Sequence, residues 1–72
     1  MIKIHLSRLL EEKQMSQAEL ARQTGIRPST ICSIYNEVAE RLNINHIDSI
    51  CRCLGCDIND LIEYVPDNHM KI

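Results

Sequence analysis

The chain has four cysteines and three histidines, whose side chains are candidates for binding a metal or attacking a substrate. Three of the cysteines, Cys51, Cys53 and Cys56, fall close together, with His46 nearby. On a helix, residues 51 and 53 point about 200° apart, so their sulfur atoms diverge and cannot share one metal ion. We therefore expect no metal site. Instead, Cys51 and Cys56 are predicted to fill the core and Cys53 to be exposed.

The histidines, His5, His46 and His69, have no serine, aspartate or cysteine partner at a spacing that suggests catalysis, and we expect them at the surface. The sequence predicts no catalytic, cofactor-binding or metal-binding residue, and the protein is not expected to be an enzyme. Cys32 lies apart from the other cysteines, within the segment described next. We hypothesise that oxidation of Cys32 switches off binding by that segment.

Residues 17–36 have the spacing and turn residues of two short helices joined by a tight turn. Ser16, followed by a glutamate three positions later, predicts a capping box that starts the first helix at residue 17. Gly25 suits a left-handed helix end, and Pro28 suits the first position of the second helix. Two helices arranged this way form a helix-turn-helix, which holds the first residues of its second helix ready to enter a DNA major groove.

Apolar periodicity predicts three further helices and two extended ends. One helix runs from about 7 to 13. Another follows Asn43, or alternatively Asn45, and ends at Gly55, and the last follows Asp57 and ends before Pro66. Residues 1–6 alternate as in a short strand, and a tail over 64–72 could lie beside them. The predicted core residues are Leu6, Leu9, Leu10, Ala18, Leu20, Ala21, Ile26, Ile31, Ile34, Tyr35, Ile44, Ile47, Ile50, Cys51, Leu54, Ile58, Leu61 and Ile62.

Seventy-two residues allow one small domain, which we place at 1–72 with its core at about 6–66. The chain has no Phe or Trp, and its aliphatic side chains favour a helical core over a sheet sandwich. A core of this size is marginal alone, which favours a dimer through the last helix or the apolar ends. The sequence shows no membrane-spanning run or signal peptide, so a cytoplasmic protein with reduced cysteines is expected.

Two segments resemble the Cro and lambda-repressor-like helix-turn-helix family, often called the XRE family. The first, residues 16–36, is SQAELARQTGIRPSTICSIYN, and the second, residues 54–66, is LGCDINDLIEYVP. The resemblance covers roughly 6–66 and is closest to small stand-alone bacterial members. It implies an all-α, five-helix bundle, with short extended arms at its ends. It also implies a sequence-specific transcriptional regulator that binds double-stranded DNA as a homodimer on a palindromic operator, with its third helix in the major groove.

The resemblance further implies which residues contact DNA. Gln17 matches a position that holds a phosphate or braces the third helix. Arg27 can grip a guanine edge with two hydrogen bonds, and a phosphate contact is its alternative. Pro28 falls where many relatives place a polar side chain that reads a base. The expected DNA-binding residues are Gln17, Arg27, Pro28, Ser29, Thr30, Ser33, Asn36 and Arg41.

The formal charge of −2 is unevenly divided along the chain. Residues 1–36 carry five basic and three acidic side chains, whereas residues 37–72 carry three basic and seven acidic ones, so an anionic partner should meet the first half. Glu37 and Glu40 lie where relatives usually have a glycine and basic residues. Because carboxylates beside the DNA backbone weaken binding, a second function stays open: a protein-interaction module, antitoxin-like or bound to another regulator. No small-molecule effector is expected.

Overall fold

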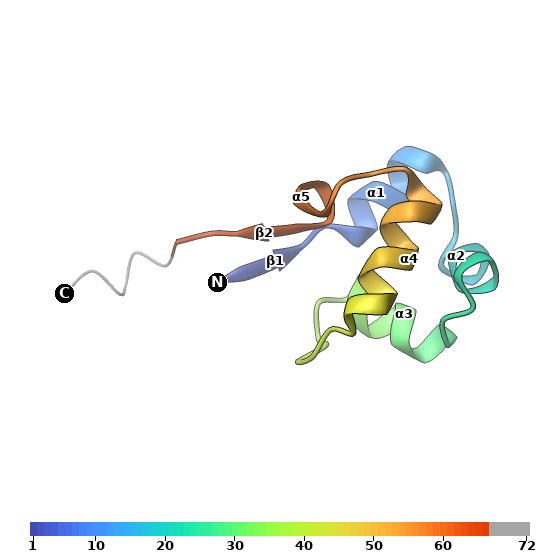
Figure 1. The fold of residues 1–72 in the computed structure, drawn as a ribbon, viewed down its shortest axis with the longest axis horizontal. Coiled ribbons are helices and arrows are strands. Elements are labelled where there is room, and N and C mark those ends of the chain that lie inside the picture. The colour runs from blue at the N-terminus through green and yellow to red at the C-terminus, as the bar shows by residue number, and fades with distance from the viewer. Residues whose placement is uncertain (67–72) are drawn as a thin grey trace.

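Five helices and two short strands make up the structure, a computed structural model that describes residues 1–66. Helices α1 to α4 pack together, and the two strands project from them as a ribbon with the N-terminus at its far end (Figure 1). No helix in residues 1–66 has the length and apolar character needed to cross a bilayer. The elements are β1 (Ile2–Ile4), α1 (Leu6–Lys13), α2 (Gln17–Thr24), α3 (Pro28–Tyr35), α4 (Ile44–Leu54), α5 (Ile58–Leu61) and β2 (Ile62–Tyr64).

Side-chain caps fix the beginnings of α2, α4 and α5. The Ser16 hydroxyl accepts a hydrogen bond from the Glu19 N–H at 3.0 Å, and the Asn43 side chain accepts one from the Asn45 N–H at 2.8 Å. Asn43, rather than Asn45, is therefore the N-cap of α4. At α5, the Asp57 N–H donates to the Asp60 carboxylate at 3.1 Å, which satisfies an amide that the helix itself leaves free.

The beginnings of α1 and α2 differ from the prediction in two details. Helix α1 begins at Leu6 rather than Ser7, because the His5 N–H donates to the Leu61 carbonyl at 2.7 Å and the His5 carbonyl already accepts from the next helical turn. At α2, the Glu19 carboxylate does not return to the Ser16 amide. It accepts hydrogen bonds from Arg22 and from the Gln23 amide, and the hydrogen bond from Arg22 is the main reason that the pKa of Glu19 is lowered.

The core is aliphatic and draws on every helix and on β1. Its buried members are Ile4, Leu6, Leu9, Leu10, Leu20, Ala21, Ile26, Ile31, Ile34, Ile47, Ile50, Leu54 and Leu61. Three predicted core residues, Ala18, Ile44 and Ile58, are exposed instead. Ile44 is 83% exposed and Ile58 is 56% exposed. Each is the first residue of its helix, and the buried residues of that helix begin further along it.

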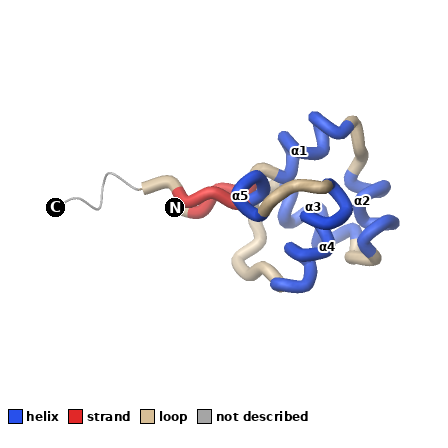
Figure 2. Tube along the Cα trace, turned by 45° about the horizontal axis from the view of Figure 1, so that its top comes forward, coloured by secondary structure: helices blue, strands red, loops and turns tan. Residues whose placement is uncertain are grey.

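The two strands correct the all-α prediction, because the fold is mostly helical with a small sheet. They pair antiparallel, with Ile2 opposite Tyr64 and Ile4 opposite Ile62, and Figure 2 shows the ribbon standing away from the helices. The predicted contact between the two chain ends is confirmed at Tyr64 and at Val65, whose N–H donates to the Met1 carbonyl at 2.7 Å. The last helix is shorter than predicted, because Ile62 and Glu63 pair with β1 as part of β2. Residues 67–72 of the predicted tail lie outside the described residues. His5, predicted at the surface, is half-buried, and its Nε2 atom lies 2.6 Å from Glu63 on β2.

Candidate nucleic-acid interface

The turn between α2 and α3 is held by backbone and side-chain contacts. Gly25 has a φ of 76°, and its N–H donates to the Ala21 carbonyl at 2.9 Å, which ends α2. The Thr24 hydroxyl donates to the Leu20 carbonyl at 2.7 Å and accepts from the Ile26 N–H at 3.3 Å. Because Ile26 is buried in the core, the chain leaves this turn in a defined direction and α3 is fixed relative to α2.

Helix α3 buries one side and leaves the other at the surface. Ile31 and Ile34 are buried, whereas Ser29 is exposed and Thr30 and Ser33 are half-buried. Pro28 occupies the first helical position, where its missing N–H breaks no helical hydrogen bond. Arg27, the N-cap, is exposed and forms no ion pair within residues 1–66. The α3 face is defined here as Arg27, Ser29, Thr30 and Ser33.

The other predicted DNA contacts lie away from the beginning of α3. Gln17, at the first position of α2, is half-buried and lines a hollow together with Tyr35, the last residue of α3. Asn36 follows directly and is exposed, with its amide donating to the Cys32 sulfur at 3.3 Å. Arg41 is exposed in the loop before α4. The predicted residues therefore extend from the N-cap of α3 to the residue after its end, with Gln17 beside its last residue and Arg41 in the following loop.

Glu37 has a structural role that the sequence did not indicate. It has a φ of 58°, the left-handed conformation that glycine favours at a helix end. Its N–H donates to the Ile34 carbonyl at 3.1 Å, and the next N–H, of Val38, donates to the Ser33 carbonyl at 3.0 Å. The Glu37 carboxylate accepts a hydrogen bond from the Ile4 N–H at 3.1 Å and so connects the end of α3 to β1.

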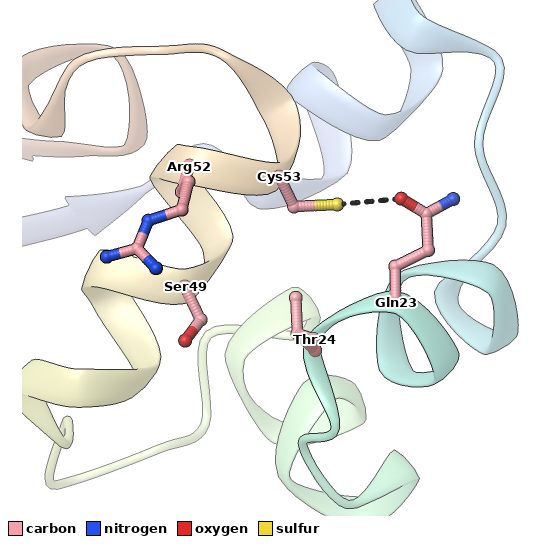
Figure 3. A pocket seen from close by; sticks show the side chains of 5 residues that line it. All are labelled: Gln23, Thr24, Ser49, Arg52 and Cys53. Carbon is pink, nitrogen blue, oxygen red and sulfur yellow. Dashed lines mark hydrogen bonds between the residues drawn. The ribbon is translucent and has the colours of Figure 1, made fainter.

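The three cysteines near the end of α4 lie in different surroundings. Within residues 1–66, no three or more His, Cys, Asp or Glu side chains gather where they could hold a metal ion. Cys53 is half-buried rather than exposed, because its thiol reaches across from α4 and donates to the Gln23 Oε1 atom at 3.2 Å (Figure 3). That contact lies in a hollow between α2 and α4, which Thr24, Ser49 and Arg52 also line. Cys51 and Cys56 are half-buried against the core, and Cys32 is exposed on α3.

Comparison with known proteins confirms the family resemblance. Residues 5–67 match the model of the Cro/C1-type HTH DNA-binding domain. Over 64 residues, the chain is 29% identical to YozG of Bacillus subtilis (strain 168), which is described as an uncharacterized HTH-type transcriptional regulator. That match covers 89% of this chain and 76% of YozG. Because the family model spans all five helices, including the α2–α3 pair, the chain belongs to the Cro/C1-type helix-turn-helix DNA-binding domains.

Proposed function

We propose that this protein is a sequence-specific transcriptional regulator that binds operator DNA with α3 in the major groove. The carrying observation is the division of α3 into a buried side, with Ile31 and Ile34, and the polar α3 face. A helix has to be held by one side only to offer its other side to a partner. The B-DNA major groove is about 12 Å wide and admits one α-helix.

The roles of the proposed contacts follow from their side-chain chemistry. Ser29, Thr30 and Ser33 carry short hydroxyls that can donate to or accept from base edges. Arg27, which is exposed and unpaired within residues 1–66, can bind either a guanine edge or a phosphate. Pro28 beside it offers only apolar contact. The proposed phosphate contacts are Gln17, Asn36, which follows the end of α3, and Arg41 in the loop before α4.

The proposed assembly is a homodimer that reads a palindromic operator. In such a dimer each subunit takes one half-site, and the half-sites are about one helical turn, or a multiple of one, apart. The outer end of the ribbon supports this proposal, because Ile2 is 57% exposed, its cross-strand partner Tyr64 is 67% exposed, and both project from the same side of the ribbon. A small domain gains stability when a second copy covers such a surface.

The position of Glu37 favours this function over the protein-interaction module. Two loop carboxylates raised that alternative, and one of them, Glu37, accepts a hydrogen bond from β1. This hydrogen bond gives Glu37 a role in the fold, so its presence in the loop does not by itself indicate that DNA binding has been lost. Glu40 is exposed and forms no ion pair within residues 1–66, so no positive side chain there offsets the repulsion between its charge and the DNA backbone.

Selection of bound sequences from a random duplex library, at about 100 mM salt, tests the proposal. We expect an enriched palindrome. A triple variant with Ser29→Ala, Thr30→Ala and Ser33→Ala should lose that enrichment while keeping its helical circular dichroism. Ser49→Ala, a half-buried change on α4 outside the proposed contacts, is the matched control and should leave the selected sequence unchanged. A folded protein that enriches nothing would refute the proposal and favour the protein-interaction module.

A further inference from the structure

We propose that Cys51 and Cys56 form a redox modification site, at which a peroxide converts the two thiols into an intramolecular disulfide. All four cysteines are free thiols in this structure. The site lies where α4 ends and the chain turns into α5. Disulfide formation at this site does not require DNA binding, so its test is independent of the test of the proposed function.

The turn after α4 brings these two residues together. Gly55 has a φ of 64°, and the N–H of Cys56 donates to the carbonyl of Cys51 at 3.1 Å. Standard bond lengths place two Cα atoms joined by one such hydrogen bond within about 7 Å of each other. Disulfides span Cα separations of roughly 4.4–6.8 Å. In this type of helix end, the side chains at the two positions also pack against each other.

The neighbouring Cys56 affects the pKa of the Cys51 thiol. This pKa is raised to about 11, first by burial and then by the charge and the hydrogen bond of the Cys56 sulfur. The pKa of Cys51 thus responds to Cys56, as expected for two side chains on either side of one helix-ending turn. Both side chains are half-buried and pack against the core. Neither therefore has to move in from solvent for the disulfide to form.

The spacing along the chain suggests a different pair, which the structure disfavours. Cys53 and Cys56 are three residues apart, as in the C-x-x-C arrangement of redox proteins. However, the thiol of Cys53 points towards α2, where it donates to Gln23 at 3.2 Å (Figure 3). Cys51 and Cys53 project about 200° apart on α4. The thiol that faces Cys56 is therefore that of Cys51.

The chemistry balances with hydrogen peroxide as the oxidant. One thiolate attacks the peroxide, the O–O bond breaks, and a sulfenic acid and one water form. The second thiol then attacks the sulfenic sulfur, an S–S bond forms, and a second water leaves. Two electrons pass from the sulfurs to the peroxide. Because the pKa of Cys51 is about 11, that thiol is protonated at neutral pH, and the reaction accelerates as the pH rises.

Trypsin provides a sharp test, because Arg52 lies between Cys51 and Cys53. The full chain with Cys32→Ser, which avoids links between molecules, is treated with hydrogen peroxide, alkylated in denaturant, digested and analysed by mass spectrometry. A link between Cys51 and Cys56 joins the peptides on either side of Arg52, lowers the mass by about 2 Da and leaves Cys53 alkylated. A link between Cys53 and Cys56 stays within one peptide.

We expect the joined peptides, which dithiothreitol should separate. Adding Cys51→Ser should abolish the joined species, whereas adding Cys53→Ser, the matched control, should retain it. Circular dichroism of each variant confirms that it is folded. The proposal is overturned if the main product is the link between Cys53 and Cys56. It is also overturned if Cys51 and Cys56 of the folded protein remain alkylatable after peroxide has oxidised Cys53.

Discussion

Glu37 is the residue whose replacement tests the structure most directly, because two opposing effects meet there. Its left-handed backbone, with a φ of 58°, strains any residue other than glycine. Its carboxylate accepts the Ile4 N–H at 3.1 Å, a contact between residues 33 positions apart. Glycine at position 37 would relieve the strain and remove the hydrogen bond, whereas alanine would remove the hydrogen bond and keep the strain.

The two effects have comparable magnitudes. A hydrogen bond to a charged group contributes about 1.5–3 kcal/mol to the free energy of unfolding, and a partly buried one lies near the lower limit. Replacing a strained left-handed residue by glycine returns about 0.5–1 kcal/mol, after the greater freedom of glycine in the unfolded chain is subtracted. We therefore expect Glu37→Ala to destabilise by about 1.5 kcal/mol, Glu37→Gly by about 0.5–1 kcal/mol, and Glu37→Gln, which keeps an acceptor oxygen, by about 0.5 kcal/mol.

Gln14 supplies the matched control. It ends α1 with a φ of 53° and is exposed, so Gln14→Gly should stabilise by the strain relief alone, about 0.5–1 kcal/mol. Thermal unfolding followed by circular dichroism resolves these differences, since 1 kcal/mol shifts the midpoint by roughly 4–8 °C in a domain of this size. Equal stabilisation by Glu37→Gly and Gln14→Gly would refute the reasoning, because the hydrogen bond to Ile4 would then contribute nothing.

Three further predictions concern the turn, the core and the cysteine pair. Gly25→Ala should destabilise by about 1–2 kcal/mol, measured by urea unfolding, because the added Cβ meets no atom within 4 Å and only the backbone strain counts. Leu20→Ala removes a fully buried side chain and should cost about 2–5 kcal/mol, so its thermal midpoint should fall far more than that of Gln17→Ala, which shortens a half-buried side chain at the first position of the same helix. The folded-state pKa of Cys51 is raised to about 11 from an ordinary value of 9.0, so its stabilising contribution is complete below pH 9 and is lost as the pH rises towards 11. Thermal midpoints between pH 8 and 11 should therefore fall more steeply for the natural protein than for Cys51→Ser, and parallel curves would contradict this.

The helix-turn-helix could be predicted because its signals are local. Ser16 caps α2, Gly25 ends it, and Pro28 opens α3, each within a few residues of the structure it determines. Ile31 and Ile34 recur at helical spacing and are buried, as expected. Such signals depend on backbone geometry and on one buried side, and both can be read from a short window of sequence.

The ribbon and the exposed isoleucines depend on distant parts of the chain. Pairing β1 with β2 brings Ile2 opposite Tyr64, and alternation within residues 1–6 can indicate a strand but not its partner. Ile44 fits the helical stripe of α4, yet no neighbouring element covers the beginning of that helix, so it is 83% exposed. The proposed DNA contacts follow from the family motif, and in the structure they extend along α3 from its N-cap to the residue after its end.

Glu37 has a role in the loop after α3 that its charge alone does not indicate. Relatives usually have a glycine and basic residues there, which suits a tight helix end beside DNA. In this chain a glycine would form the turn without strain but would leave the Ile4 N–H without its carboxylate acceptor, and a lysine would provide neither benefit. The acidic residue thus serves the ribbon, which joins the N-terminus to the end of α3. Glu40, exposed and with no ion pair within residues 1–66, has no such contact, so its charge is the one in this loop that the fold does not explain.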